Sequence, residues 1–244
     1  MKQDEYESYD AIGLADLVAR GEVSAGELLD AALARVGEVN PRINAVIRLV
    51  EDQARAAIAE GLPEGPLAGV PFLIKDVTVQ MKGAPTTGGS RLLMNAAPAS
   101  ADSAIVAAYR RAGLVLFGKT NTPEFGLAAT TEPVAFGPSR NPWNLERSTG
   151  GSSGGAAAAV AAGIVPAAHA SDGGGSIRTP ASCCGLFGMK PSRGRIPMGP
   201  TRTEGWGGLS CHHAVSHSVR DSAAIMDVTH GVEPGSRYAA PTPD

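Results

Sequence analysis

The stretch SDGGGSIRTP, residues 171–180, combines a hydroxyl group and a backbone that together could attack a carbonyl. Three glycines stand directly before Ser176, and glycine permits positive φ and close backbone approach. Successive backbone N–H groups before a helix attract negative charge, so this loop could stabilise an oxyanion beside the Ser176 hydroxyl. A glycine turn with Ser176 as a helix N-cap is the structural alternative. The expected oxyanion-hole residues are Gly173, Gly174 and Gly175.

A serine nucleophile needs a base, and the sequence offers one well-placed lysine and several histidines. Lys75 follows the apolar run Val70–Ile74, which we expect to be a buried strand. Burial there would lower the pKa of Lys75 and leave its amine partly neutral. A lysine that reaches solvent from a strand end is the alternative. The candidate histidine bases are His169, His212, His213, His217 and His230.

A second glycine-serine loop, residues 150–155, holds Ser152 and Ser153 before an alanine-rich stretch that predicts a helix. Residues 151–155 also match G-x-S-x-G, the nucleophile elbow of α/β-hydrolases. That elbow follows a strong strand, and residues 142–149 do not resemble one. We therefore rank a lysine-based serine site above a hydrolase elbow.

Two further patterns suggest other chemistry but do not fit their context. GLVLFGKT, residues 113–120, matches the phosphate-binding pattern G-x-x-x-x-G-K-[ST], yet its interior resembles a strand and Pro123 follows. We expect a buried strand there. The pairs Cys183–Cys184 and His212–His213 match no common structural-zinc spacing. We expect no metal and no organic cofactor.

The composition favours a soluble globular protein. The chain has 244 residues, of which 43% are hydrophobic, and a net charge of −3. Basic residues are scattered, so we expect no nucleic acid and no membrane surface as partner. The N-terminus is acidic and lacks the apolar stretch of a signal peptide, which favours a cytoplasmic location.

Helical and extended patterns alternate along the chain. Ser24 and Glu27 form a capping box before a helix that we expect to end before Asn40. A helix between two buried strands predicts a βαβ unit in the middle of the chain. The other expected elements are helices at residues 10–20, 52–60 and 101–112, and strands at residues 43–50, 70–74 and 114–117.

GGSSGGAAAAVAAG, residues 150–163, followed by SDGGGSIRTPASCCGLFGMKPSRGRIP, residues 171–197, resembles the amidase signature family. The match runs from roughly residue 65 to residue 227. It implies an α/β fold with a twisted mixed β-sheet flanked by helices. The supporting elements are AGVPFLIKDV (68–77), GKTNTPEFG (118–126) and RNPWN (140–144).

The resemblance implies a Ser-cisSer-Lys triad. Lys75 matches the catalytic lysine of the family, Ser152 the bridging serine after a cis peptide bond, and Ser176 the nucleophile. In the mechanism that follows, Lys75 draws a proton through Ser152 from Ser176, which attacks an amide carbonyl. The residues expected to support this site are Ser153, Asp172 and Arg178.

The resemblance also organises the chain into three parts. We expect a helical N-terminal segment at 1–64, a signature core with the triad at 65–232, and a Pro-rich tail at 233–244 where family members continue. Since those members are considerably longer, we expect a truncated member or an N-terminal half with an incomplete sheet. A homo-oligomer, or a partner chain that supplies the remaining half, would complete it.

The expected function is hydrolysis of a carboxamide C–N bond to a carboxylate and ammonia or an amine, through a Ser176 acyl-enzyme. A glutamine-dependent amidotransferase catalytic chain is one alternative, although Gly173 stands where such chains usually have Thr. A catalytically idle binding fragment is another. The identity of the amide stays open, as do the roles of four histidines. These are His169, His212, His213 and His217.

Overall fold

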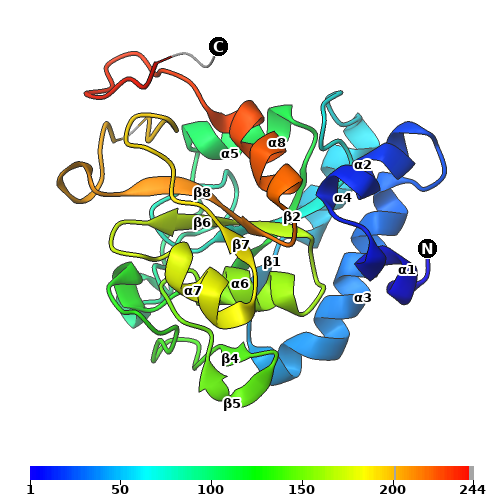
Figure 1. Ribbon diagram of the computed structural model, residues 1–244, viewed down its shortest axis with the longest axis horizontal. Helices are drawn as coiled ribbons and strands as arrows, with labels where there is room; N and C mark the ends of the chain where they lie inside the picture. The colour runs from blue at the N-terminus through cyan, green and yellow to red at the C-terminus, as the bar shows by residue number, and fades with distance from the viewer. Residues whose placement is uncertain (201, 242–244) are drawn as a thin grey trace.

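A six-stranded mixed sheet organises the computed structural model, which describes residues 1–200 and 202–241 (Figure 1). The central pairings bring β3, β2 and β6 together in parallel, while β1, β8 and β7 pair antiparallel. This is the predicted α/β class with a mixed sheet, and helices cover both faces. The strands in sheet order are β1 (Val46–Leu49), β3 (Val115–Thr120), β2 (Pro71–Lys75), β6 (Ala167–Asp172), β8 (Cys211–Ser216) and β7 (Phe187–Gly188).

The N-terminal helices follow their capping signals. Ser24 accepts from the Glu27 N–H and the Glu27 carboxylate accepts from the Ser24 N–H, so the predicted capping box is present. The predicted end before Asn40 is wrong, because the helix continues through Pro41 to Ile43. A proline in the last turn removes only one hydrogen bond, and the Asn40 side chain secures the exit by accepting from two following N–H groups. These helices are α1 (Gln3–Ser8), α2 (Ala11–Ala19), α3 (Ala25–Ile43) and α4 (Glu51–Glu60).

The predicted βαβ unit is confirmed as β2, α5 (Ala104–Arg111) and the parallel strand β3. The GLVLFGKT segment forms β3 and does not form a phosphate loop. Lys119 of that segment is fully buried, with Nζ 2.7 Å from an Asp76 carboxylate oxygen and donating to the Pro85 carbonyl at 2.8 Å. The Lys119 ammonium group is therefore paired with the Asp76 carboxylate inside the core.

The long connection after β3 includes a hairpin of β4 (Arg140–Asn141) and β5 (Asn144–Ser148). The alanine-rich helix α6 (Gly154–Ala161) follows it and is almost wholly buried. Gly155 is required there, because a Cβ atom would lie 2.5 Å from the Asn121 carbonyl oxygen. Small side chains thus let α6 lie directly against the sheet and the neighbouring loop.

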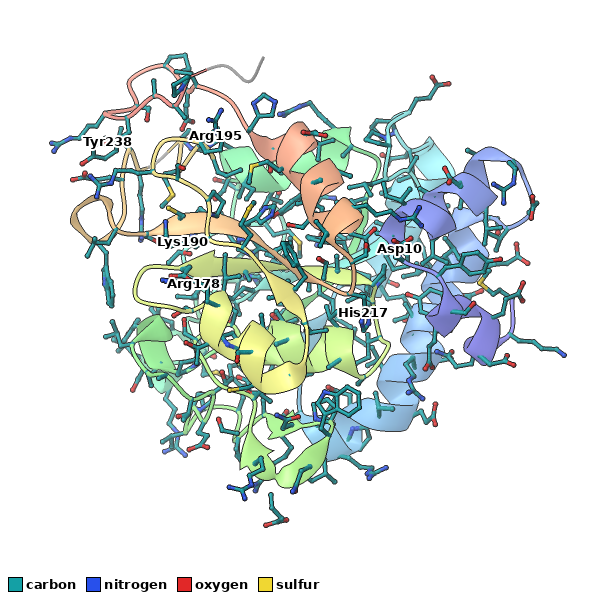
Figure 2. All side chains as sticks on the ribbon, viewed as in Figure 1. Asp10, Arg178, Lys190, Arg195, His217 and Tyr238 are labelled. Carbon is teal, nitrogen blue, oxygen red and sulfur yellow. The ribbon has the colours of Figure 1, made fainter. Side chains whose placement is uncertain are left out.

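Helices α6 and α7 (Arg178–Cys184) lie on one side of the sheet in Figure 1, and α5 and α8 (Val219–Thr229) on the other. Asp10 joins the first helices to the last one: its carboxylate caps α2 through the Gly13 N–H and accepts from the Ser218 hydroxyl, which itself caps α8 (Figure 2). One hydrophobic core runs from Tyr6 to Ile225.

Three short 3₁₀ helices complete the described secondary structure: η1 (Arg91–Leu93), η2 (Glu124–Gly126) and η3 (Trp206–Gly208). Within residues 233–241 of the predicted tail there is no helix or strand, and residues 242–244 lie outside the described part. Among the described helices, none has the length and apolar character needed to cross a bilayer.

Candidate active site

Lys75 ends β2 and is fully buried, with its amine inside a ring of three hydroxyl groups. Nζ lies 2.7 Å from Ser152 Oγ, 2.9 Å from Ser153 Oγ and 3.1 Å from Ser171 Oγ. Burial lowers the pKa of Lys75 to about 7, and the charge of Asp172 only partly opposes this shift. A neutral amine at this place can donate two hydrogen bonds and accept a proton through its lone pair.

The serine pair lies directly before α6, and the Gly151–Ser152 peptide bond is cis. The Thr122 hydroxyl donates to the Ser152 carbonyl at 3.0 Å and holds the backbone of this turn. Ser153 Oγ contacts both backbone groups of Ser171 at 3.3 Å. Ser152 retains slight exposure and borders a cavity, whereas Ser153 is fully enclosed.

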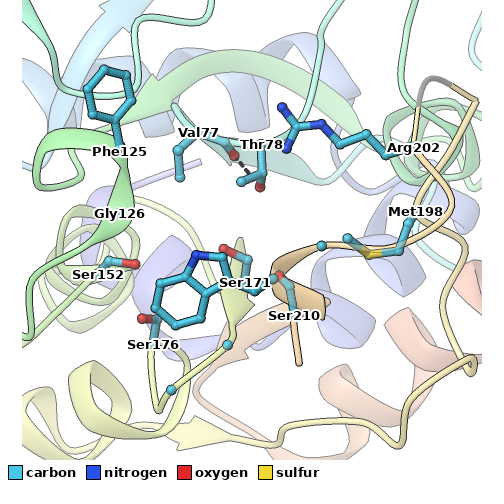
Figure 3. Close-up of a pocket in the computed structure, with 14 residues that line it drawn as sticks. Val77, Thr78, Phe125, Gly126, Ser152, Ser171, Ser176, Met198, Arg202 and Ser210 are labelled. Carbon is cyan, nitrogen blue, oxygen red and sulfur yellow. Dashed lines mark hydrogen bonds between the residues drawn. The ribbon is translucent and has the colours of Figure 1, made fainter. Parts of the chain in front are cut away.

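Ser176 borders the same cavity as Ser152 and is partly exposed (Figure 3). It is not a helix N-cap, because α7 begins at Arg178 with Ile177 as its cap residue. The Ser176 carbonyl accepts from the Ser153 N–H at 3.3 Å, which ties the two glycine-serine loops together. Within the described residues, no hydrogen bond joins the Ser152 and Ser176 hydroxyls.

The buried carboxylate of Asp172 organises the loop that holds Ser176. It accepts from the N–H groups of Gly175 at 2.7 Å and Ile177 at 3.1 Å, and from two guanidinium nitrogens of Arg178, each at 2.9 Å. Burial opposes ionisation of Asp172, but these hydrogen bonds together hold its pKa below the usual value. Figure 2 shows Arg178 at the end of β6, where it meets this loop.

The Asp172 carboxylate also contacts one residue of the expected oxyanion hole. The Gly175 N–H donates to Asp172 Oδ1 at 2.7 Å. Gly173 and Gly174 line the cavity, together with Ser176. Within the described residues, the N–H groups of Gly173, Gly174 and Ser176 donate to no protein acceptor.

The cavity has a volume of about 90 Å³ and draws its wall from separate segments (Figure 3). Its apolar contributors come from the turn after β2, from η2, and from the segment that precedes β8. Val77 and Phe125 lie in segments that carry the family resemblance, but the sequence does not mark any of these residues as part of a cavity wall, because they meet only in the folded chain. They are Val77, Phe125, Met198 and Trp206, with Arg202 at the rim.

Among the described hydrogen bonds, none joins a histidine side chain to Ser152 or Ser176. Among the described side-chain hydrogen bonds, His169 contacts the Lys75 N–H and His212, while His213 contacts Ser222. His217 is exposed at the end of β8, apart from Arg178 and the loop it holds (Figure 2). The G-x-S-x-G interpretation thus lacks a histidine partner in the described residues.

No group of three His, Cys, Asp or Glu side chains in the described residues could hold a metal ion. Cys183 is exposed, whereas Cys184 and Cys211 are buried, and all three thiols are free. Burial raises the pKa of Cys184 to about 12, which leaves it an unreactive thiol.

The geometry agrees with comparisons to known proteins. The chain is 49% identical over 236 residues to 6-aminohexanoate-cyclic-dimer hydrolase of Paenarthrobacter ureafaciens, covering 96% of this chain and 48% of that protein. The putative amidase AmiC of Mycobacterium tuberculosis strain H37Rv is 45% identical over 217 residues, covering 88% of this chain and 46% of that protein. The chain thus spans about half the length of the curated relatives it matches.

Solved structures of amidases also match this chain over about half of their length. A 6-aminohexanoate cyclic dimer hydrolase superposes with a TM-score of 0.93 at 48% identity, over 97% of this chain and 49% of that one. A bacterial aryl acylamidase of the amidase signature family gives 0.89 at 37% identity, over 96% of this chain and 50% of that one. The family model described as Amidase matches residues 27–244. The chain belongs to the amidase signature family.

Proposed function

We propose that this chain provides the acylating site of a serine amide hydrolase, with Ser176 as nucleophile, Ser152 as proton relay and Lys75 as base. The observation that supports it most is the buried Lys75 amine, 2.7 Å from Ser152 Oγ and with a pKa of about 7. A neutral lysine beside a relay hydroxyl at the wall of a cavity is suited to deprotonate a serine in that cavity.

Formation of the tetrahedral intermediate transfers two protons and forms one C–O bond. Lys75 Nζ takes the Ser152 hydroxyl proton, Ser152 Oγ takes the Ser176 hydroxyl proton, and Ser176 Oγ bonds to the amide carbon. The carbonyl π electrons move to oxygen, where the N–H groups of Gly173, Gly174 and Ser176 stabilise the negative charge.

Collapse of the tetrahedral intermediate reverses the proton path. The electrons return to re-form the carbonyl as the C–N bond breaks, and the Lys75 proton reaches the leaving nitrogen through Ser152. A water molecule then attacks the Ser176 ester, with Lys75 again accepting a proton through Ser152. The ester C–O bond breaks as this proton returns through Ser152 to Ser176 Oγ, and the released carboxylic acid loses its proton to solvent. The products are a carboxylate and an amine or ammonia, and the triad returns to its starting state.

The cavity wall and the relatives indicate the kind of amide to test. Val77, Phe125, Met198 and Trp206 offer apolar surface for a hydrocarbon chain. A 49% identical relative is named a 6-aminohexanoate-cyclic-dimer hydrolase. We therefore propose aliphatic secondary amides, linear or cyclic, as the substrate class, and the 6-aminohexanoate cyclic dimer as the first compound to assay.

The amidotransferase alternative has weaker support. The structure of a glutamyl-tRNA(Gln) amidotransferase chain from Thermotoga maritima superposes with a TM-score of 0.77 at 31% identity, over 100% of this chain and 49% of that one. The hydrolase structure matches better on both measures. Release of ammonia from glutamine only when a second chain is added, without turnover of simple amides, would favour the amidotransferase.

A fluorophosphonate probe tests the site without knowledge of the substrate. Mass spectrometry of the labelled chain is expected to find the adduct on Ser176, to lose it in Ser176→Ala and to find it strongly reduced in Lys75→Ala. Ser100→Ala, which removes an exposed serine from a surface loop, serves as the matched control and should label like the unmodified chain. Folded protein that fails to label at Ser176 would support the idle-fragment alternative instead.

A further inference from the structure

Two buried histidines form a hydrogen-bonded chain that ends at the backbone of Lys75. The Lys75 N–H donates to His169 Nδ1 at 3.3 Å, and His169 Nε2 lies 3.2 Å from His212 Nδ1. Both rings are fully buried, His169 on β6 and His212 on β8. We propose that His169 and His212 are positioning residues, which hold the Lys75 backbone so that its amine reaches the serine hydroxyls. This inference rests on the proposed role of Lys75.

The direction of the hydrogen bonds follows from the first donor. A backbone N–H can only donate, so Nδ1 of His169 must accept and carries no proton. Neutral His169 then has its proton on Nε2 and donates it to Nδ1 of His212. Neutral His212 in turn has its proton on Nε2. A proton added to His169 Nδ1 would face the Lys75 N–H, and this geometry therefore requires a neutral His169.

The ring of His169 supplies an acceptor on the β6 side of Lys75, which pairs with Thr120 of β3 on its other side. The pairing of β2 with β6 is limited to Leu73 and Ala168, so the ladder does not extend to Lys75. A buried N–H without an acceptor is costly, and the imidazole nitrogen supplies that acceptor. It does so at the one residue of β2 whose side chain must reach across to the turn before α6.

The charges around this histidine pair favour the same neutral state. Burial, with smaller effects from His212, Lys75, Lys119 and His213, lowers the pKa of His169 well below its usual value. Burial, then Lys75 and Arg202, lowers the pKa of His212 to about 4. Tyr109 also packs against the pair: its ring meets His169 edge-on at 6.0 Å, and burial raises the pKa of its hydroxyl.

Neutral rings are suited to a lysine that must lose its proton near pH 7. A carboxylate in their place would stabilise the ammonium form of Lys75 and raise its pKa. Asp172 is the one acidic group with a charge effect on Lys75 in the described residues, and its charge is shared with Arg178. The histidines therefore orient the backbone without adding a negative charge beside the amine.

His213 provides an internal comparison. It neighbours His212 on β8 and is equally buried, but its Nε2 contacts Ser222 Oγ at 2.7 Å on α8. Within the described residues, the His213 ring makes no hydrogen bond with His169, His212 or Lys75, so its replacement removes a buried imidazole of the same strand and leaves those hydrogen bonds in place.

The experiment compares His169→Asn with His169→Leu in the full chain. Asn keeps an acceptor for the Lys75 N–H but fills less volume, whereas Leu fills the volume and offers no acceptor. A positioning role therefore predicts the larger defect in His169→Leu, and a packing role predicts the larger defect in His169→Asn. His212→Asn and His212→Leu make the same comparison at the second ring of the chain. They replace the His169 pair if a His169 variant does not fold. His213→Leu is the control.

Two readouts separate this inference from the proposed function. NMR of chains with ¹³C at lysine Cε reports the Lys75 pKa directly, with Lys75→Arg assigning the signal and no catalysis required. We expect His169→Asn and His213→Leu to titrate as the unmodified chain does, and His169→Leu to shift upward by about one pH unit or more as the amine moves toward water. The rate of Ser176 labelling should fall by about 100-fold in His169→Leu and by less than about 10-fold in His169→Asn.

The two proposals fail in different ways. If Ser176 never labels but the Lys75 pKa follows the expected order, the proposed function is wrong and the positioning role stands. If Ser176 labels and His169→Leu matches the unmodified chain in both readouts while His169→Asn departs from it, the histidines are packing residues and the inference is overturned.

Discussion

Lys75 Nζ lies 2.7 Å from Ser152 Oγ, although the two residues are 77 positions apart in the chain. The lysine ends a central strand and the serine stands in the turn before α6, so the contact depends on the helix packing directly against the sheet. The glycines and alanines of α6 permit that approach. Small residues on this helix thereby bring the proposed base within reach of the proposed relay.

The rate of Ser176 labelling should depend on the protonation of Lys75. Because burial lowers the pKa of Lys75 to about 7, only the neutral amine present above that pH can accept a proton from Ser152. The labelling rate should rise through pH 7 and level off above it. A rate that is flat between pH 5 and pH 9 (roughly two units on either side) would contradict the assignment of Lys75 as base.

Burial of Lys75 should also make the stability of the chain depend on pH. Its pKa is about 7 when folded and 10.5 when free, so between these values the unfolded chain binds more protons. The free energy of unfolding therefore carries no penalty from Lys75 above pH 10.5, and it decreases as the pH falls toward 7. We expect Lys75→Met to raise the free energy of unfolding relative to the unmodified chain, most near pH 7 and least near pH 10.5. Urea unfolding at both pH values measures this difference.

The two neighbouring serines should differ in importance, although both contact the Lys75 amine. Ser152 borders the cavity that also holds Ser176, while Ser153 is enclosed and contacts the Ser171 backbone. We expect Ser152→Ala to slow labelling of Ser176 by about 100-fold or more, and Ser153→Ala by about 10-fold. Equal losses would mean that the relay can pass through either hydroxyl.

Asp172 should matter more for the Ser176 loop than its ion-pair partner. Asp172→Ala leaves the Gly175 and Ile177 N–H groups without their acceptor, and we expect it to destabilise the fold by about 2–4 kcal/mol. Arg178 is 53% exposed, so Arg178→Ala should cost only about 1 kcal/mol. Denaturant unfolding of both variants measures the difference, and a larger loss for Arg178→Ala would contradict this ordering.

Lys119 should act as a structural residue without a role in nucleotide binding. Its amine pairs with Asp76 inside the core, and Lys119→Ala would leave that carboxylate buried without its partner. We expect a loss of about 3–5 kcal/mol in unfolding free energy. ATP with magnesium should leave the melting temperature of the unmodified chain unchanged, and a clear upward shift would restore the phosphate-loop interpretation of GLVLFGKT.

Local patterns in the sequence predicted the strands β1, β2 and β3 with the helices around them, but not β6, β7 or β8. The capping box at Ser24, the βαβ unit and the alanine-rich helix are all present, because each depends on residues close together in the chain. The helix α3 extends past its predicted end before Asn40. The local rule for Pro41 does not include the hydrogen bonds that Asn40 makes with residues beyond the helix.

The sequence by itself determined which residue types were available for chemistry: Lys75 after an apolar strand, and Ser152 and Ser176 in glycine-rich loops. Only the tertiary structure decided what surrounds them. It buried the Lys75 amine among three hydroxyls, turned the Gly175 N–H toward Asp172, and set His169 against the Lys75 backbone. A pKa and a hydrogen-bond partner depend on distances of a few ångströms between segments far apart in the chain, and those distances exist only once the sheet and helices have packed.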